Sequence, residues 1–175
     1  MIQIRKVGSE SIPRIKALAD RTWPVAYGSI LSPDQMRYML DLIYSTASLE
    51  KQIEQLHHQF ILALDTSMPC GFASYSPLEV SLRENEMINA DKNIYRLHKL
   101  YIDPAHQGKG IGKFLLDFIN SDIKQKGATD LELNVNRHNK ALDFYQKAGF
   151  VIIREEDIAI GNGYFMNDFV MNLSI

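Results

Sequence analysis

The sequence predicts a mixed α/β (α+β) fold, with a mostly antiparallel central sheet of about six or seven strands flanked by helices. Segments in which apolar and polar residues alternate predict the strands, and segments with apolar residues three and four positions apart predict the helices. The stretch 106–113, His-Gln-Gly-Lys-Gly-Ile-Gly-Lys, lies where an extended apolar segment becomes an amphipathic helix. That junction predicts a right-handed crossover within the sheet.

The composition indicates a globular protein in a reducing compartment. A chain of 175 residues has the length of one domain, which we expect to span 1–175. The net charge of −2 gives no basic surplus for nucleic acid, and the longest apolar runs are too short to cross a membrane. The single cysteine, Cys70, excludes a disulfide within the chain and favours a cytoplasmic location, and the N-terminus lacks a signal-peptide pattern.

The chain begins with a predicted strand and helix. The strand covers 2–7, and the helix after it has Pro13 in its first turn. We expect this helix to break at 22–24, because the residue before a proline is pushed out of the helical conformation. The aromatic loop that follows has two interpretations. Trp23 and Tyr27 close the end of the core, or they line a substrate pocket.

Two further helices and a hairpin complete the first half. Ser32 followed by Pro33 and Gln35 is typical of a helix capping box. The adjacent His57 and His58 lack the i, i+4 spacing of a helical metal pair, so we expect no metal. The predicted elements are a helix from Pro33, a helix at 48–59, strands at 60–65 and 70–76 with a turn at 66–69, an extension of the second strand at 78–82, and a polar loop at 83–93 that contains Glu84 and Glu86.

The second half alternates strands and helices. Gly127 is typical of a helix C-cap, and Gly149 ends a short helix in the same way. The predicted elements are a strand at 94–103, a helix at 110–126, a strand at 131–135, a helix at 140–148, a strand at 150–154, a tight turn at 161–163 and a last strand at 164–173.

Three phosphate-binding patterns compete for the glycine-rich stretch. A Walker A loop fails because Phe114 follows Gly112-Lys113, and a Rossmann fingerprint fails because Lys113 occupies its third glycine position. The pattern that fits is Gln-x-x-Gly-x-Gly, at Gln107, Gly110 and Gly112. Glycines at a helix N-terminus leave backbone N–H groups for an anion, although a plain glycine-rich turn has the same composition.

Two motifs resemble the GNAT (GCN5-related) N-acetyltransferases. The segment 97–116 is similar to that family's acetyl-CoA-binding core, and 139–150 is similar to its helix Asn-x-x-Ala-x-x-Phe-Tyr-x-Lys-x-Gly-Phe. Residues 23–27, the helices through Gln59 and the ending 167–171 resemble bacterial polyamine acetyltransferases of the PaiA type. The resemblance implies a GNAT-type sheet that is splayed at the two strands around the acetyl-CoA site.

The resemblance also implies which residues hold acetyl-CoA, the co-substrate. The pyrophosphate would lie on the loop N–H groups, the pantetheine arm would pair with the strand at 100–102, and a backbone N–H near Tyr101 or Ile102 would polarise the acetyl carbonyl. The implied cofactor-binding residues are Leu100, Tyr101, Ile102, Gln107, Gly108, Lys109, Gly110, Ile111, Gly112, Lys113, Asn134, Asn139 and Tyr145.

Catalysis needs an acid for the CoA thiolate and a route for the amine proton. Tyr145 matches the family's general acid, with a core aromatic as the alternative. Strand alternation puts Arg96 and His98 on one face, and His98 has a suitable pKa for the base. A packed or solvated histidine, or a chain of waters leading to bulk solvent, is the alternative. Arg96 counts slightly against a cationic polyamine, because like charges repel.

The resulting hypothesis is an N-acetyltransferase that acts on a primary amine of a small molecule, with polyamines among the candidates, by direct attack in a ternary complex. The alternatives are a peptide or protein N-acetyltransferase and a CoA-binding module without turnover. We expect a monomer or a homodimer whose partners are acetyl-CoA and the amine, with no nucleic acid, membrane or metal.

Overall fold

The computed structural model describes residues 1–78 and 92–175. Contacts between residues divide the chain into two compact units. The first unit comprises 1–74 and 99–116, and the second comprises 75–98 and 117–175. The prediction that 1–175 forms one domain stays a prediction.

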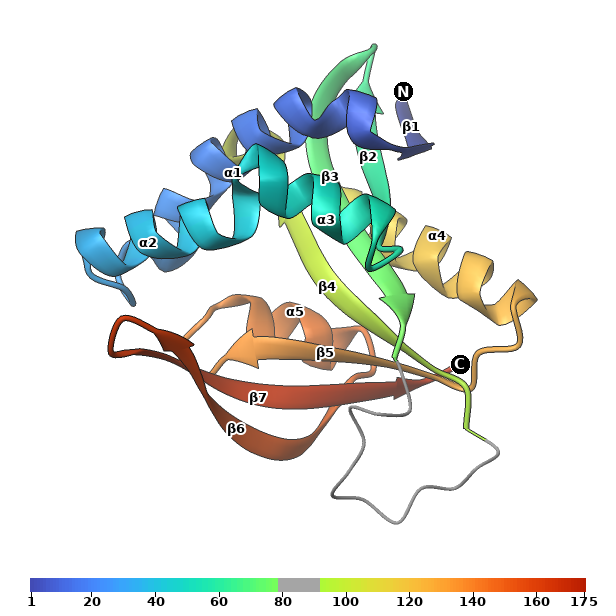
Figure 1. Cartoon of the computed structure of the whole chain (residues 1–175). Coiled ribbons are helices and arrows are strands. Elements are labelled where there is room, and N and C mark those ends of the chain that lie inside the picture. Colours follow the sequence, from blue (N-terminus) through green and yellow to red (C-terminus); the bar gives the residue numbers. More distant parts are fainter. Residues whose placement is uncertain (79–91) are drawn as a thin grey trace. The chain divides into compact units, whose positions relative to one another are not determined.

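The described residues form five helices and seven strands (Figure 1). They are β1 (Ile2–Val7), α1 (Ile12–Tyr27), α2 (Pro33–Tyr44), α3 (Thr46–Glu54), β2 (Gln59–Asp65), β3 (Met68–Pro77), β4 (Ile94–Ile102), α4 (Ile111–Gln125), β5 (Asp130–Asn136), α5 (Ala141–Lys147), β6 (Val151–Gly161) and β7 (Tyr164–Ser174), with short 3-10 helices at Ser9–Ser11 and Pro104–His106.

The strand order in the sheet is β1-β2-β3-β4-β5-β7-β6. β1 pairs antiparallel with β2, and β7 pairs antiparallel with both β5 and β6, whereas β4 and β5 are parallel. The predicted mixed, mostly antiparallel sheet is therefore confirmed. The parallel ladder ends at Leu97 and Leu133, although β4 continues to Ile102.

In the first unit, α1 and α2 pack on β3 through aromatic side chains. The Tyr44 ring of α2 contacts the Trp23 ring of α1 and the Phe72 ring of β3, with centroids 5.6 and 6.1 Å away. The predicted helix start at Ser32 is confirmed, because the Ser32 hydroxyl accepts a hydrogen bond from the Gln35 backbone N–H at 3.2 Å. These contacts give the unit its core.

The predicted break at 22–24 is wrong, because α1 continues through Pro24 to Tyr27. A proline inside a helix removes one backbone hydrogen bond. The turn is held by other contacts: Gly28 donates to the Pro24 carbonyl at 3.0 Å, and Trp23, only 3% exposed, lies 4.6 Å from the Tyr27 ring. Burial of Trp23 outweighs the lost bond. The predicted aromatic loop is therefore the last turn of a helix.

Several predicted boundaries also move. The third helix starts at Thr46, since Ser45 accepts a hydrogen bond from the Ser48 N–H, and it ends at Glu54. Thr66 and Ser67 both have positive φ, which makes a two-residue hairpin turn and leaves Met68 and Pro69 in β3. The predicted strand at 150–154 extends to Gly161. Most of the predicted extension at 78–82 and of the loop at 83–93, with Glu84 and Glu86, lies outside the described residues.

In the second unit, β5 has one apolar face and one polar face. Leu131, Leu133 and Val135 lie opposite Leu173, Met171 and Phe169 of β7, whereas Glu132, Asn134 and Asn136 lie opposite Asn172, Val170 and Asp168. The chain after α5 lies on the apolar face, because a Cβ added to Gly149 would be 3.3 Å from Leu173 Cδ1. The opposite face carries Glu132 of β5 and Asp168 of β7.

Candidate active site

The end of β4 is anchored within the first unit. The backbone N–H of Asp103 donates to the Cys70 carbonyl at 2.9 Å, and the Asp103 carboxylate accepts a hydrogen bond from Arg21 Nε of α1 at 2.7 Å. A Cβ on Gly71 would lie 2.8 Å from Ile102 Cδ1 and 3.0 Å from the Tyr101 carbonyl oxygen. Only glycine allows β3 to come this close, so this strand end has a fixed position within the unit.

The glycine-rich stretch follows directly. Gln107 Nε2 donates to the Ile102 carbonyl at 3.2 Å, so this side chain ties the loop to the end of β4. Gly108 and Gly110 have φ values of +75° and +76°, and a Cβ on either would meet nothing within 4 Å. Backbone conformation, and not crowding, therefore requires glycine at both positions.

Helix α4 begins at the end of this loop. Its first backbone hydrogen bond is donated by Phe114 to the Gly110 carbonyl at 3.0 Å. The N–H groups of Ile111 and Gly112 precede it, so helix geometry provides them with no acceptor in the helix. Together with the helix dipole, such groups favour an anion at this end of α4.

Five aromatic residues of the first unit form a cluster, which we call the aromatic cluster. Its members are Trp23, Tyr27, Tyr44, Phe72 and Tyr101. The Tyr27 and Tyr101 hydroxyls are 3.0 Å apart and hydrogen bonded, and Trp23 Nε1 donates to the Tyr44 hydroxyl at 3.2 Å. The predicted pocket residues Trp23 and Tyr27 thus contact Tyr101, a predicted cofactor residue.

Lys99 lies beside this cluster and was not among the predicted site residues. It is 8% exposed, its Nζ donates to Gln52 Oε1 at 2.5 Å, and it lies 5.8 Å from the Tyr44 ring centroid and 5.5 Å from that of Phe60. Burial lowers the pKa of Lys99 to about 7. The signal in the sequence was its position between Leu97 and Tyr101 on the inward face of a strand.

Tyr145 and Asn139 lie in the second unit. The Tyr145 ring of α5 is packed between Phe144 and Phe150, with centroids 5.2 and 5.6 Å away, and the residue is 8% exposed. Asn139 Oδ1 accepts a hydrogen bond from the Ala141 N–H at 2.9 Å, which fixes the start of α5. That bond gives Asn139 a structural role at the start of the helix, and it leaves the side-chain amide as a donor.

His98 and Arg96 also belong to the second unit. His98 Nε2 is 2.9 Å from the Ser76 hydroxyl on β3, and the residue is exposed. Arg96 donates to Asn134 Oδ1 at 2.6 Å and to Glu132 Oε2 at 3.3 Å. Arg96 is therefore partly neutralised, although burial lowers its pKa.

Six side chains on the polar face of this unit form a charged network, namely Arg96, Glu132, Asn134, Arg154, Glu156 and Asp168. Besides the contacts of Arg96, Arg154 pairs with Glu156 at 2.8 Å and with Glu132 at 3.8 Å. Asn134 Nδ2 donates to Glu156 Oε2 at 3.1 Å and is also hydrogen bonded to the Asp168 carboxyl. Of these residues, Asn134 was a predicted cofactor residue and Arg96 was considered beside the predicted base. The network as such was missed, because its members come from four strands.

The carboxyl of Asp168 is 6% exposed. Its burial, and to a smaller extent the neighbouring Glu156 carboxylate, raise its pKa to about 6, against the opposing effects of Asn134 and Arg137. A carboxyl with this pKa changes its charge close to neutral pH.

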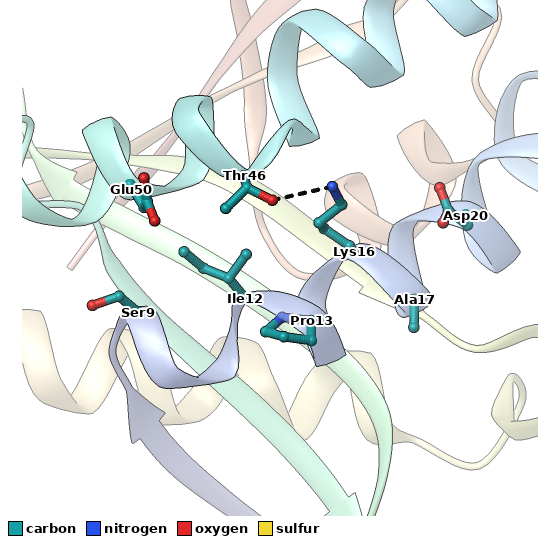
Figure 2. Close-up of a pocket in the computed structure, with 8 residues that line it drawn as sticks. All are labelled: Ser9, Ile12, Pro13, Lys16, Ala17, Asp20, Thr46 and Glu50. Carbon is teal, nitrogen blue, oxygen red and sulfur yellow. Dashed lines mark hydrogen bonds between the residues drawn. The ribbon is translucent and has the colours of Figure 1, made fainter.

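The first unit also contains an open groove of about 580 Å³ between the start of α1 and α3 (Figure 2). It is lined by Ser9, Ile12, Pro13, Lys16, Ala17, Asp20, Thr46 and Glu50, and the Lys16 Nζ donates to the Thr46 hydroxyl at 3.3 Å. None of these residues is a predicted site residue, so we do not place the chemistry there.

Two features are absent from the described residues. Across 1–78 and 92–175, no three His, Cys, Asp or Glu side chains are grouped as a metal ion requires. In the same residues, no helix has the length and apolar character needed to cross a membrane.

The predicted site residues are thus divided between the units. The loop 107–113, the strand end 100–102, Trp23 and Tyr27 belong to the first unit. His98, Asn134, Asn139 and Tyr145 belong to the second.

Comparisons with known proteins point to one family. A family model described as an acetyltransferase (GNAT) domain matches residues 30–167. The chain is 26% identical to a spermidine N(1)-acetyltransferase of Thermoplasma acidophilum, over 86% of this chain and 89% of that one. It is also 26% identical to the N-alpha-acetyltransferase RimI of Mycobacterium tuberculosis, over 74% of this chain and 80% of that one.

A solved structure extends the comparison to the whole chain. The crystal structure of the PaiA N-acetyltransferase from Thermoplasma acidophilum in complex with coenzyme A matches with a TM-score of 0.78 and 27% identity. The match covers 100% of this chain and 99% of that chain.

Proposed function

Because the chain belongs to the GNAT family and is an acetyl-CoA-dependent N-acetyltransferase, we propose that its acceptor is a primary amine of a small molecule. Binding of the donor, acetyl-CoA, is supported by the loop with positive φ at Gly108 and Gly110, which leads directly into α4. Its backbone N–H groups suit a pyrophosphate, since neither glycine has a side chain to obstruct the approach.

We propose contacts of the donor with the residues that match the family's motifs. In the first unit, Gln107 to Lys113 would hold the phosphates, and the backbone of Leu100, Tyr101 and Ile102 would pair with the amide-containing arm. In the second unit, Asn134 and Asn139 would contact the arm. The bound donor supplies a thioester, whose carbonyl a backbone N–H near Tyr101 or Ile102 would polarise.

The transfer requires two proton movements. The amine nitrogen forms a bond to the acetyl carbon, the bond from that carbon to sulfur breaks, and the sulfur takes a proton. Tyr145 is proposed as the donor of that proton. His98 is proposed to take the proton that the amine loses, with the Ser76 hydroxyl 2.9 Å from its Nε2 fixing the ring.

The small-molecule acceptor is supported by the aromatic cluster. The hydrogen bond between Tyr27 and Tyr101 ties the end of α1 to the end of β4, where an extended peptide would need room. The relative named a spermidine N(1)-acetyltransferase points to polyamines. The relative named RimI keeps a peptide or protein N-terminus as a second candidate.

A thiol-release assay tests this proposal. Purified protein and acetyl-CoA are incubated with spermidine, amino acids, aminoglycosides and short peptides, with heat-denatured protein as the blank. We expect thiol release with at least one small amine. Release with peptides alone would establish the second candidate, and acetyl-CoA binding without release on the whole panel would indicate a binding module. A cytoplasmic location and the monomeric or homodimeric state stay predictions.

A further inference from the structure

The charged network of the second unit has an excess of negative charge. Three of its members are carboxyl groups, Glu132, Glu156 and Asp168, and two are guanidinium groups, Arg96 and Arg154. Burying charged groups is costly unless each has a partner of opposite charge. The net charge of the network therefore depends on the one carboxyl without such a partner, that of Asp168.

Two of the carboxylates are paired. Glu132 Oε2 lies 3.3 Å from Arg96 and 3.8 Å from Arg154, and Glu156 Oε1 lies 2.8 Å from Arg154 Nε. Both Arg96 and Arg154 are used in these contacts. The Glu156 carboxylate consequently has a lowered pKa, because its hydrogen bonds to Arg154 and Asn134 outweigh its burial.

Asp168 differs from Glu132 and Glu156 in its contacts. In the described parts of the chain, no lysine, arginine or histidine lies within ion-pair distance of its carboxyl oxygens. The guanidinium of Arg137 bonds to the Asp168 backbone carbonyl at 3.4 Å, and its charge is shared between Asp157 at 2.9 Å and Glu155 at 3.6 Å. The side-chain amide of Asn134 is the contact that holds the Asp168 carboxyl.

The place of Asp168 in the sheet puts it on the same face as Asn134, one of the predicted cofactor residues. It is the register partner of Asn136 on β5 and of Glu156 on β6, and so it lies on the polar face. The chain that ends the helix of Tyr145 lies on the other face, at Leu173. Asp168 thus lies on the same face as Asn134. It is also hydrogen bonded to this predicted cofactor residue.

We propose that Asp168, together with Glu156 and Asn134, binds the ammonium group of a cationic acceptor and so determines the specificity of the enzyme for charged amines. The inference rests on the proposed function. An ammonium group would supply the positive charge that the network lacks and would form a charge-assisted hydrogen bond. The objection that Arg96 repels cations loses force, because Glu132 and Asn134 occupy its guanidinium.

A binding experiment tests the inference. Spermidine is titrated calorimetrically into the wild-type protein and the Asp168→Asn variant, with and without CoA, at pH 7.5. Asparagine keeps the shape of the side chain, and we expect it to weaken spermidine binding about tenfold or more, the usual effect of losing a charge-assisted contact. CoA affinity should stay unchanged. The control is Asp157→Asn, an exposed carboxylate of the same unit, which should bind spermidine like the wild type.

Steady-state kinetics separate a specificity role from a structural one. With spermidine as acceptor, the KM of Asp168→Asn should rise while its kcat changes less. Equal spermidine affinity in both variants, or a wild-type protein that does not bind spermidine, would overturn the inference. The proposed function fails separately, if the wild-type protein neither binds acetyl-CoA nor releases thiol with any amine, whatever Asp168 does to spermidine binding.

Discussion

Lys99 and Asp168 are both buried ionisable groups without an ion pair in the described residues, but their surroundings differ. Lys99, in the first unit, is surrounded by the Tyr44 and Phe60 rings and the Gln52 amide. Asp168, in the second unit, lies within a network of guanidinium and carboxylate groups. Burial shifts the two pKa values toward neutrality from opposite sides, to about 7 and about 6.

The difference indicates a division of tasks. Apart from Lys99, the first unit offers backbone N–H groups and aromatic rings, which bind by shape and dipole and do not change with pH. The second unit offers Tyr145, His98 and the charged network, which can exchange protons or hold a cation. We therefore expect substitutions in the glycine loop to affect donor binding, and substitutions at Tyr145 and in the charged network to affect turnover and acceptor choice.

The largest effect should come from Gly110→Glu in the first unit. A glutamate there puts negative charge at the proposed phosphate site and forces a side chain to adopt φ +76°. We expect CoA binding by calorimetry to disappear. Gly163→Glu is the matched control, because Gly163 also has φ +76° and open space around its Cβ, but it lies in the β6–β7 turn. Equal CoA affinity in the two variants would argue against the loop assignment.

Tyr145→Phe in the second unit should reduce turnover and spare binding. Removing a general acid costs about 10²–10⁴-fold in rate, so we expect kcat to fall by at least about a hundredfold with CoA affinity unchanged. Tyr95→Phe is the control, because Tyr95 is equally buried, at 7% exposed, in the same unit. A kcat like that of the wild type would remove Tyr145 from the mechanism.

Lys99→Met tests how much the buried ammonium group of Lys99, which has no ion pair in the described residues, lowers the stability of the fold. A lysine has a pKa of about 10.4 when unfolded, so between pH 7 and 10 the unfolded chain binds more protons than the folded one, whose Lys99 pKa is about 7. Stability from this group therefore rises with pH over that window. We expect the Tm of the wild type to rise from pH 7 to 9 relative to that of Lys99→Met. Lys124→Met, an exposed lysine, should follow the wild type at each pH.

Of these variants, Asp168→Asn should show the smallest effect. It should raise the stability of the protein, whereas most core substitutions lower it. The folded-state pKa of about 6 lies above the unfolded value, so stability is lost as pH rises from about 4 to 6. At pH 7.5 the variant should melt about 2–4 °C higher, which corresponds to about 1 kcal/mol in a chain of this size. Below pH 4 this gain in Tm should vanish. A lower Tm at pH 7.5 would show that the carboxylate is stabilising.

The contrast between the units also shows what the sequence could predict. The glycine loop is defined by a contiguous stretch, because positive φ at Gly108 and Gly110 is a local property. The helix N-cap at Ser32 is local too. The charged network was not predictable in this way, since Arg96, Asn134 and Asp168 meet only through strand register. The helix through Pro24 was missed because the packing of Trp23, a tertiary effect, outweighed a local rule.

Trp23 is the only tryptophan of the chain, and it lies 4.6 Å from the Tyr27 ring and 6.2 Å from the Tyr101 ring. All tryptophan fluorescence therefore originates beside the strand end proposed to hold the acetyl donor. A ligand that moves the Tyr101 hydroxyl away from Tyr27 would change the environment of the indole and its emission. The protein consequently contains an intrinsic optical probe, with which donor binding can be followed without a label and on the timescale of stopped flow.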